Sequence, residues 1–278
     1  TFDIEEWFHI LDNSSTKGEK EWGQYESRIH ANMDLIFKLL EENNKKATFF
    51  CLGWIAQKYP EVIKRIDELG YEIGTHSNMH QLAYEQNKNE YKQDLECSIK
   101  SIEDLIGKKI ISYRAPGFSL KEENKWVFDE LIKQGITIDC SIFPAKRSHG
   151  GFSSFGVAEP CWVDIDGVRI KEFPINLMSI LNQKLIFSGG GYFRALPLGI
   201  LKKWFASSDY VMTYFHPRDF DAKQPLIEGL SVARRFKSYY GLKNAYGKLD
   251  EILKYQDFID LKQADEMIDW TNAKVKFI

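Results

Sequence analysis

The chain has 278 residues, of which 44% are hydrophobic and 28% are charged, and its formal net charge is −3 at pH 7. This composition is ordinary for a folded globular protein, and it excludes collagen, a coiled coil and a disordered chain. A chain of this length buries roughly three quarters of its unfolded surface, so one large domain needs no disulfide to be stable. Because the chain has no basic surplus, we expect no nucleic acid among its partners.

The longest apolar runs, such as Ala47 to Trp54, are of strand length and fall short of the roughly 18 residues of a membrane helix. The four widely spaced cysteines form no Cys-x-x-Cys pair, so we expect reduced, buried thiols at Cys51, Cys97, Cys140 and Cys161. Thr1 begins a strand-like run, so we expect upstream sequence to be missing; a cytoplasmic location is favoured, with the periplasm and secretion as alternatives.

Short β-branched or aromatic runs alternate with amphipathic stretches, which is typical of parallel βα units in an open sheet or a closed barrel. The expected strands are Ala47 to Leu52, Glu72 to Thr75, Ile110 to Arg114, Ile136 to Ser141, Ile170 to Pro174 and Tyr210 to Phe215. The expected helices are Ile29 to Asn43, Pro60 to Leu69, Asn89 to Ile106, Glu122 to Gln134 and Pro197 to Phe205.

Two regions depart from this alternation. Between Phe143 and Asn176, the pattern predicts a hairpin from Trp162 to Ile170 that turns at Asp166-Gly167. Later come the expected elements of a C-terminal extension: helices at 230–240 and 244–255, a strand at 258–261 and a closing helix at 263–270. We find no repeat or linker, so we expect a single domain over residues 1–278, with residues 230–278 packed on it as a helical extension.

His76 and His80 are the first candidate site residues. Two histidines four residues apart in a tight loop face the same way and can hold one divalent cation through their ring nitrogens. They follow the expected strand Glu72 to Thr75, at the carboxyl end where α/β folds place their sites. The alternative is two loop histidines without a ligand.

The first strand carries a second candidate pair. Asp3 and Glu5 are two residues apart, so both side chains point to one face of the strand. Two buried carboxylates normally imply a cation or a shared proton. The alternative is a solvated acidic strand end. Glu6 fits this alternative better than Asp3 or Glu5 does, because its side chain points to the opposite face of the strand.

Three further candidates end apolar runs. Arg114 in Tyr-Arg-Ala-Pro can pair with a carboxylate and orient it. Asp139 in Asp-Cys-Ser and His216 in Tyr-Phe-His-Pro complete the set, because an Asp beside a His tunes an imidazole for acid catalysis. Individually, each residue is more often structural than functional.

Taken together, these five stretches resemble the conserved blocks of the polysaccharide deacetylase family, carbohydrate esterase family 4. Those blocks, Thr-Phe-Asp-Asp, His-(Ser/Thr)-x-x-His, Arg-x-Pro, Asp-x-Ser and Leu-x-His, match Thr1 to Glu5, His76 to His80, Arg114 to Pro116, Asp139 to Ser141 and Tyr214 to His216. Gly189 to Arg194 and Phe215 to Asp221 resemble a bacterial branch associated with exopolysaccharide and surface-glycan gene clusters.

The resemblance implies a distorted TIM-like (β/α)7 barrel and one divalent metal, most often Zn, with Co, Ni and Mn as alternatives. It implies a hydrolase that removes N-acetyl groups from a sugar in a bacterial polysaccharide or its precursor, with an N-acetylated glycan as substrate. Asp3 would be the base, oriented by Arg114, and His216 the acid, tuned by Asp139.

Two blocks depart from the family: Tyr214 replaces the Leu of Leu-x-His, where an aromatic can build the same apolar wall, and the first block departs at a ligand position. Its second Asp, normally a metal ligand, is Ile4 here, so we assign Glu5, His76 and His80 to the metal, with exchange of Asp3 and Glu5 as the alternative. The glycine run at Gly189 lacks the Lys-Ser/Thr ending of a phosphate loop and a following helix start, so we interpret it as a close-approach loop. The candidate sugar contacts are aromatic: Trp7, Phe118, Tyr192, Phe193 and Phe215.

Two other functions stay open at this point. A metal-independent amidohydrolase of a small cyclic amide is one, against which His76 and His80 argue. The other is a glycan-binding protein with a degraded catalytic centre, which Ile4 suggests because it stands at a ligand position.

Overall fold

The computed structural model describes residues 1–11, 13–147, 150–180 and 183–278. Two compact units make up the chain: unit 1 consists of Thr1–Ala47 and Met178–Ile259, and unit 2 of Thr48–Leu177 and Asp260–Ile278. Strands and helices alternate through most of the chain, so the expected α/β class is confirmed. The single domain over residues 1–278 stays a prediction.

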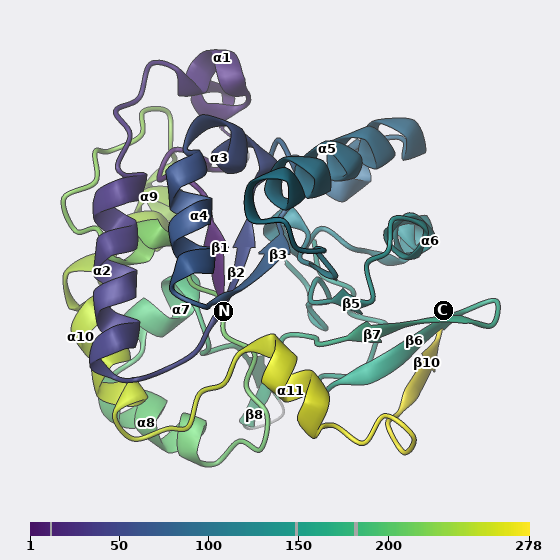
Figure 1. Cartoon of the computed structure of the whole chain (residues 1–278). Coiled ribbons are helices and arrows are strands. Elements are labelled where there is room, and N and C mark those ends of the chain that lie inside the picture. Colours follow the sequence, from purple (N-terminus) through teal and green to yellow (C-terminus); the bar gives the residue numbers. More distant parts are fainter. Residues whose placement is uncertain (12, 148–149, 181–182) are drawn as a thin grey trace. The chain divides into compact units, whose positions relative to one another are not determined.

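The strands of unit 2 form one sheet in the order β2-β3-β4-β5-β7-β6-β10 (Figure 1). Neighbours from β2 to β7 run parallel, β6 is antiparallel to β7, and β10 is parallel to β6. Their bounds are Thr48–Cys51 (β2), Glu72–Thr75 (β3), Ser112–Tyr113 (β4), Ile138–Asp139 (β5), Cys161–Ile165 (β6), Val168–Glu172 (β7) and Val275–Phe277 (β10).

Helices connect the parallel strands of unit 2, as the apolar periodicity predicts. Helices α3, α4 and α5 pack on one another. The longest of them, α5, begins with a capping box at Asn87 and ends at Gly107, whose φ of 66° suits a glycine. The helices are Gly53–Lys58 (α3), Pro60–Glu68 (α4), Ala83–Glu85 (η2), Lys88–Ile106 (α5), Pro116–Phe118 (η3), Glu122–Asn124 (η4), Trp126–Lys133 (α6) and Leu261–Met267 (α11).

The hairpin of β6 and β7 is confirmed, and it turns at Asp166 and Gly167, which both have positive φ. The predicted strand at Phe258 to Leu261 is wrong. Asp260 accepts a hydrogen bond from the backbone N–H of Gln263 and so starts helix α11 at Leu261. The strand of this region is β10, which the pattern did not indicate.

Unit 1 contains three extended segments that run side by side. Strand β1 (Phe2–Ile4) bridges Phe215 in parallel, and Tyr214 bridges Gly189 in parallel. The N–H of Asp3 donates to the carbonyl of Phe215 at 2.8 Å. Only the last two residues of the strand expected at Tyr210 to Phe215 therefore pair as a strand does.

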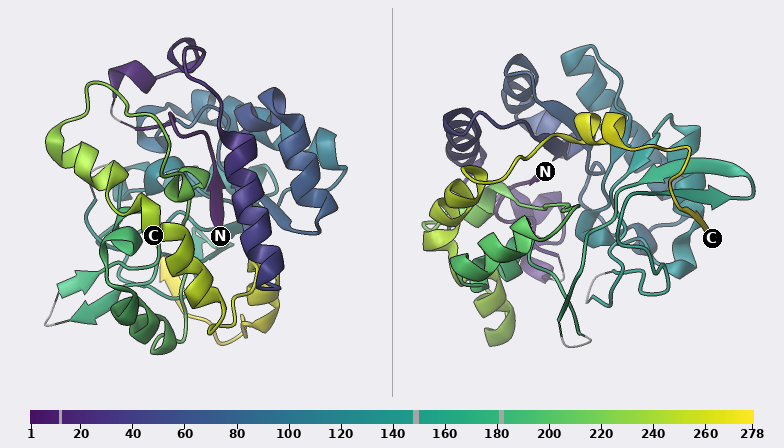
Figure 2. Two further views of the ribbon diagram at one scale, coloured as in Figure 1. Left: turned by 90° about the vertical axis from the view of Figure 1, so that its left-hand side faces the viewer. Right: turned by 90° about the horizontal axis from the view of Figure 1, so that it is seen from below.

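Helices make up most of the rest of unit 1, with a small hairpin of β8 (Met178–Ile180) and β9 (Gln183–Leu185). Helices α2 and α10 lie side by side (Figures 1 and 2), and Asn43 Nδ2 donates to Asp250 Oδ1 at 3.0 Å. The helices are Ser14–Thr16 (η1), Glu19–Trp22 (α1), Ile29–Glu42 (α2), Gly190–Ala195 (α7), Leu198–Ala206 (α8), Pro217–Phe220 (η5), Val232–Tyr239 (α9) and Leu242–Leu253 (α10).

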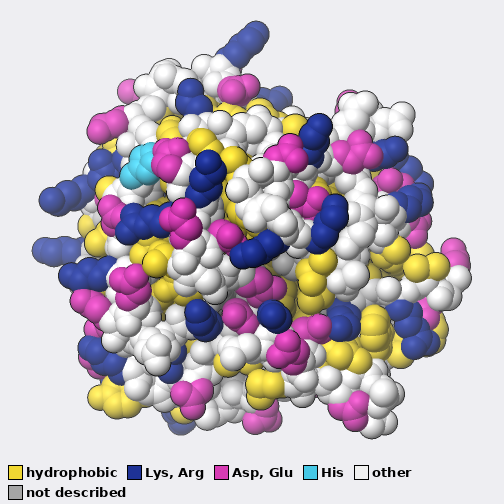
Figure 3. Space-filling view, viewed as in Figure 1, with side chains coloured by type: hydrophobic (Ala, Val, Ile, Leu, Met, Phe, Trp, Pro, Cys, Tyr) yellow, Lys and Arg dark blue, Asp and Glu magenta, His cyan; other side chains and the backbone are white. Residues whose placement is uncertain are grey.

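Surface charge, cysteine burial and helix hydrophobicity can each be compared with what the sequence predicts. Figure 3 shows basic side chains interspersed with acidic ones on the face in view. Cys51, Cys140 and Cys161 are buried as expected, whereas Cys97 is exposed on α5, which corrects the prediction for that thiol. Within the described ranges, we find no helix with the length and hydrophobicity of a membrane span.

Glu6 differs from its expected place on a solvated strand end. It is 1% exposed, and its carboxylate accepts the backbone N–H groups of Arg28 and Ile29 and the hydroxyl of Ser27. These N–H groups begin helix α2, where an anion is stabilised by the unsatisfied donors and the helix dipole. Burial raises the pKa of Glu6, while these hydrogen bonds act in the opposite direction.

We predict that Glu6→Ala destabilises the protein by about 1–3 kcal/mol, because buried N–H groups at the start of α2 lose their acceptor. Urea unfolding measures the change, and Glu26→Ala is the matched control, since Glu26 is exposed on the same segment. Equal midpoints for the two variants would show that the Glu6 hydrogen bonds add no net stability.

Candidate active site

Unit 1 brings three of the predicted residues together around one imidazole. The pairing of β1 with Phe215 places His216 beside the end of β1. Its Nε2 lies 3.8 Å from Oδ2 of Asp3 and 3.9 Å from Oε1 of Glu5. Both carboxylates are buried, at 2% and 5% exposure, and they face the same ring, as the alternation of side chains along a strand requires.

The orientation of His216 is set by Asp219, which the sequence analysis did not select. Asp219 Oδ2 accepts both the backbone N–H of His216, at 2.9 Å, and its ring Nδ1–H, at 3.0 Å. With Nδ1 held in this way, Nε2 is the nitrogen directed at Asp3 and Glu5. Asp219, not Asp139, therefore takes Nδ1 of His216, which corrects the predicted pairing.

Asp219 is itself held by a buried ion pair. Its second oxygen, Oδ1, pairs with Arg194 of helix α7, and both side chains are at most 4% exposed. Arg194 also donates to the carbonyl oxygens of Lys237 and Tyr240. His216 and Asp219 are three residues apart and form a capping box at the start of η5. This spacing was the sequence signal that could have identified Asp219.

Arg218 adds a second cation near these carboxylates. Its guanidinium lies over the ring of Tyr239 at 5.7 Å from the centroid. Burial lowers the pKa of Arg218, while the charge of Glu5 acts in the opposite direction. A cation in this position partly offsets the clustering of buried acids in unit 1.

Unit 2 holds the two predicted histidines at the carboxyl end of β3. His76 continues the ladder, since its N–H donates to the carbonyl of Cys51 at 2.8 Å. Its ring Nδ1 lies 2.7 Å from the carbonyl oxygen of Arg114, so Nδ1–H is the donor and Nε2 carries the lone pair. The rings of His76 and His80 are both buried, with centroids 5.5 Å apart.

The loop between the histidines is fixed by Asp94 of α5. Its carboxylate accepts the N–H groups of Asn78 at 2.7 Å and of Met79 at 3.0 Å. Burial raises the pKa of Asp94, and these hydrogen bonds act in the opposite direction. A Cβ at Gly53 would overlap Asn78 Oδ1 and the backbone of α5, so only glycine permits this packing. No sequence motif pointed to Asp94.

Arg114 is fully buried at the end of β4. Its Nε donates to the carbonyl of Cys140 at 3.2 Å, and the guanidinium lies 4.4 Å from the ring centroid of Phe50 and 5.5 Å from that of Phe118. These contacts hold the guanidinium in place within unit 2.

Asp139 lies beside a second buried acid. The strand register pairs Asp139 with Glu172, and both side chains are 0% exposed. The hydroxyl of Ser141 donates to Asp139 Oδ1, and the backbone N–H of Ile142 donates to Glu172 Oε1 at 3.1 Å. Burial, and next the charge of Asp139, raise the pKa of Glu172 well above its ordinary value.

The aromatic candidates fall into two groups. Tyr192 is 51% exposed, so its ring has an open face. The others are buried at 3% exposure or less, which fits packing and corrects the expectation of open sugar platforms at Trp7, Phe118, Phe193 and Phe215.

The glycine run behaves in part as expected. A Cβ at Gly189 would overlap the backbone oxygen of Tyr214, so the close approach at this position is confirmed. We expected no helix to start after these glycines, and this prediction is wrong, since α7 begins at Gly190.

Two family models match adjoining stretches of the chain. Residues 22–136 match the polysaccharide deacetylase family, and residues 140–266 match a domain of unknown function, DUF3473. The resemblance inferred from the motifs is therefore confirmed over residues 22–136, which are similar to the polysaccharide deacetylase family. His76, His80 and Arg114 lie in the first stretch, and His216 lies in the second.

Characterised relatives resemble parts of the chain. A peptidoglycan-N-acetylglucosamine deacetylase of Bacillus cereus is 33% identical over 96 residues, which are 34% of this chain and 35% of that protein. A peptidoglycan deacetylase of Helicobacter pylori is 26% identical over 132 residues, 47% of this chain and 42% of that protein. The matches thus span less than half the length of these relatives.

Solved structures share the fold. A protein of Mycobacterium smegmatis, provisionally described as a polysaccharide deacetylase, has a TM-score of 0.60 at 16% identity and covers 89% of this chain and 80% of its own. A 4-alpha-glucanotransferase of Thermococcus litoralis has a TM-score of 0.58 at 12% identity, over all of this chain and 40% of its own. At such identities the likeness concerns the fold alone.

We predict that Glu172→Gln weakens the decline of stability with rising pH. Folding raises the pKa of Glu172, so the folded state binds this proton more tightly; the resulting stabilisation is complete below the ordinary value of 4.5 and is lost as the pH rises above it. The amide that replaces the carboxyl group has no such proton to lose.

Urea unfolding of the wild type and the variant between pH 4.5 and pH 8 measures this difference. Glu123→Gln is the matched control, because Glu123 is exposed in unit 2. Parallel stability curves for Glu172→Gln and the wild type would exclude a tightly held proton at Glu172.

Proposed function

We propose that the chain is a metal-dependent hydrolase that removes N-acetyl groups from an N-acetylated sugar in a bacterial polysaccharide or its precursor. The observation that carries the proposal is the cluster of Asp3, Glu5 and His216, with its Nε2 within 3.9 Å of both carboxylates. The polysaccharide deacetylase match at residues 22–136 supports the class of reaction, and the relatives named as N-acetylglucosamine and chitooligosaccharide deacetylases support an N-acetylhexosamine substrate.

We infer that Glu5, His76 and His80 supply the ligands of one divalent cation. They offer one carboxylate and two imidazoles, all buried, which is a donor set typical of catalytic zinc; Co, Ni and Mn are alternatives. The carbonyl of Arg114 fixes Nδ1 of His76, as an outer partner of a metal-binding histidine does. When bound, such a cation polarises the acetyl carbonyl and makes water easier to deprotonate.

The residues of this chain supply the proton transfers. Asp3 takes the proton of the attacking water, and the family resemblance gives Arg114 the task of orienting it. His216 donates a proton from Nε2 to the departing amine, because Asp219 holds Nδ1 and keeps the ring turned toward Asp3 and Glu5. Backbone N–H groups near the site assist the tetrahedral oxyanion.

We predict that acetate release from N-acetylglucosamine oligomers stops when the protein is stripped with chelator and returns when Zn²⁺ or Co²⁺ is added. His80→Ala lowers kcat/KM by more than about 100-fold, because one of three ligands is lost. His30→Ala, at an exposed position of α2, is the matched control and keeps full activity.

Three outcomes would contradict this assignment. Acetate release that continues without metal favours the metal-independent amidohydrolase. Stoichiometric metal and saturable glycan binding without acetate release from any N-acetylated glycan favours a binding protein with a degraded centre. Equal losses in His80→Ala and His30→Ala would exclude a specific role for His80.

We predict that Glu5→Ala loses metal while Asp3→Ala keeps it and loses activity. Removing one of three ligands weakens binding, whereas removing the base leaves the ligands in place. Metal content after dialysis, measured by mass spectrometry with acetate release in parallel, separates the two roles. Full metal in Glu5→Ala together with loss in Asp3→Ala would reverse them.

A further inference from the structure

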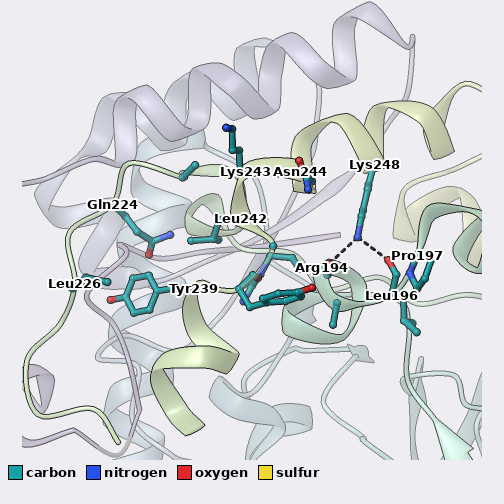
Figure 4. Close-up of a pocket in the computed structure, with 14 residues that line it drawn as sticks. Arg194, Leu196, Pro197, Gln224, Leu226, Tyr239, Leu242, Lys243, Asn244 and Lys248 are labelled. Carbon is teal, nitrogen blue, oxygen red and sulfur yellow. Dashed lines mark hydrogen bonds between the residues drawn. The ribbon is translucent and has the colours of Figure 1, made fainter. Parts of the chain in front are cut away.

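A pocket in unit 1 is separate from the proposed catalytic residues. It has a volume of about 670 Å³, which is within the range of small-molecule sites. Its walls are the end of α7 with the turn after it, the segment around Gln224, and the junction of α9 with α10 (Figure 4). Every lining residue falls within the stretch that matches the domain of unknown function.

Gln224 supplies a buried acceptor in this pocket. It is 6% exposed, and its Nε2 donates to the carbonyls of Arg218 at 2.7 Å and Asp221 at 2.9 Å, which fixes the amide. Its Oε1 has no hydrogen-bond partner in the part of the chain that the structure describes. Figure 4 shows the amide reaching toward Leu242. A buried oxygen without a donor is costly, so a ligand hydroxyl or amide would stabilise it.

The charged groups of the pocket are cationic. Arg194, Lys243 and Lys248 line it, and among the described residues no Asp or Glu does. Lys248 Nζ donates to the carbonyls of Arg194 and Leu196, each at 2.7 Å, which holds its charge at the wall (Figure 4). Helix α10 begins here without a side-chain cap, so its N-terminal dipole adds positive potential. Because Arg194 is already paired with Asp219, Lys243, Lys248 and the start of α10 supply the positive potential that favours an anion.

An exposed aromatic pair adjoins these groups. Tyr240 lines the pocket with 49% of its surface exposed, and its ring stacks on that of Phe236, with centroids 4.6 Å apart and planes at 27°. A flat, half-exposed ring offers apolar surface to the C–H face of a pyranose. An aromatic platform, an amide acceptor and lysines together match a sugar ring that carries a negative group.

We propose that this pocket binds an anionic glycan, that is, sugar residues bearing a carboxylate or a phosphate group. Tyr240 stacks on a ring, Gln224 accepts from a hydroxyl, and Lys243 with the start of α10 binds the anion. Arg194 joins the pocket to the proposed site, because it pairs with the carboxylate that orients His216. Binding of an anionic glycan in this pocket does not require the chain to release acetate from it.

The test compares two hexasaccharides of equal length on the full, metal-loaded chain by titration calorimetry. Hyaluronan hexasaccharide carries a carboxylate on every second residue, whereas its carboxyl-reduced form carries the same N-acetyl groups but no charge. We expect hyaluronan to bind about tenfold or more tightly, since it alone offers an anion to Lys243 and the start of α10. Lys243→Glu and Tyr240→Ala each weaken hyaluronan binding by about tenfold.

Lys203→Glu is the matched control, because Lys203 is exposed on α8 in unit 1, does not line the pocket, and gives the same change in charge. We expect it to leave affinity unchanged. Circular dichroism verifies that Tyr240→Ala is folded, and Lys243→Glu, at an exposed position, tests the pocket independently. Displacement by glucuronate marks a carboxylate site and displacement by inorganic phosphate a phosphate site; both support the proposal.

Equal affinity for the two hexasaccharides, no saturable binding of either, or full affinity in both pocket variants overturns the proposal. Acetate release is measured separately on the same variants with a short N-acetylated oligomer. A chain that binds hyaluronan through this pocket but releases no acetate would contradict the proposed function and leave this inference standing.

Discussion

The cluster in unit 1 depends on one backbone pairing, the parallel contact between β1 and the segment that ends at Phe215. The hydrogen bond from the N–H of Asp3 to the carbonyl of Phe215, at 2.8 Å, brings together residues more than 200 positions apart in the chain. Because side chains alternate along an extended strand, this register also decides which acids face His216. A shift of one residue would direct Ile4 at the ring and remove both carboxylates from it.

Buried charge is balanced in a different way at each acidic cluster. Asp219 is neutralised by Arg194, Glu6 is solvated by the N–H groups that begin α2, and burial raises the pKa of Glu172 beside Asp139, which favours the uncharged form. Each device avoids the cost of an isolated buried carboxylate. Asp3 and Glu5 face His216, the charge of Glu5 acts on Arg218, and the inferred cation would complete this balance.

Local chemistry could be read from the sequence, whereas long-range partners could not. The helical periodicity of Ile29 to Asn43 predicted α2 to within a residue, and the Asp-Gly turn predicted the hairpin of β6 and β7. The pairing of His216 with Asp219 was missed because an Asp at a family position, Asp139, competed with an unremarkable Asp three residues away. Asp94 carried no signal, since its role arises only when α5 packs beside the histidine loop.

Asp219 lies where the proposed catalytic cluster and the proposed glycan pocket of unit 1 meet. One oxygen holds the imidazole of His216, and the other pairs with Arg194, whose side chain lines the glycan pocket. A carboxylate shared by two fixed partners has little freedom to turn, so the imidazole keeps its direction without depending on substrate. A glycan bound against Arg194 would lie next to Asp219, which positions the proposed catalytic acid His216. Substrate recognition and proton donation would then be supported by the same ion pair.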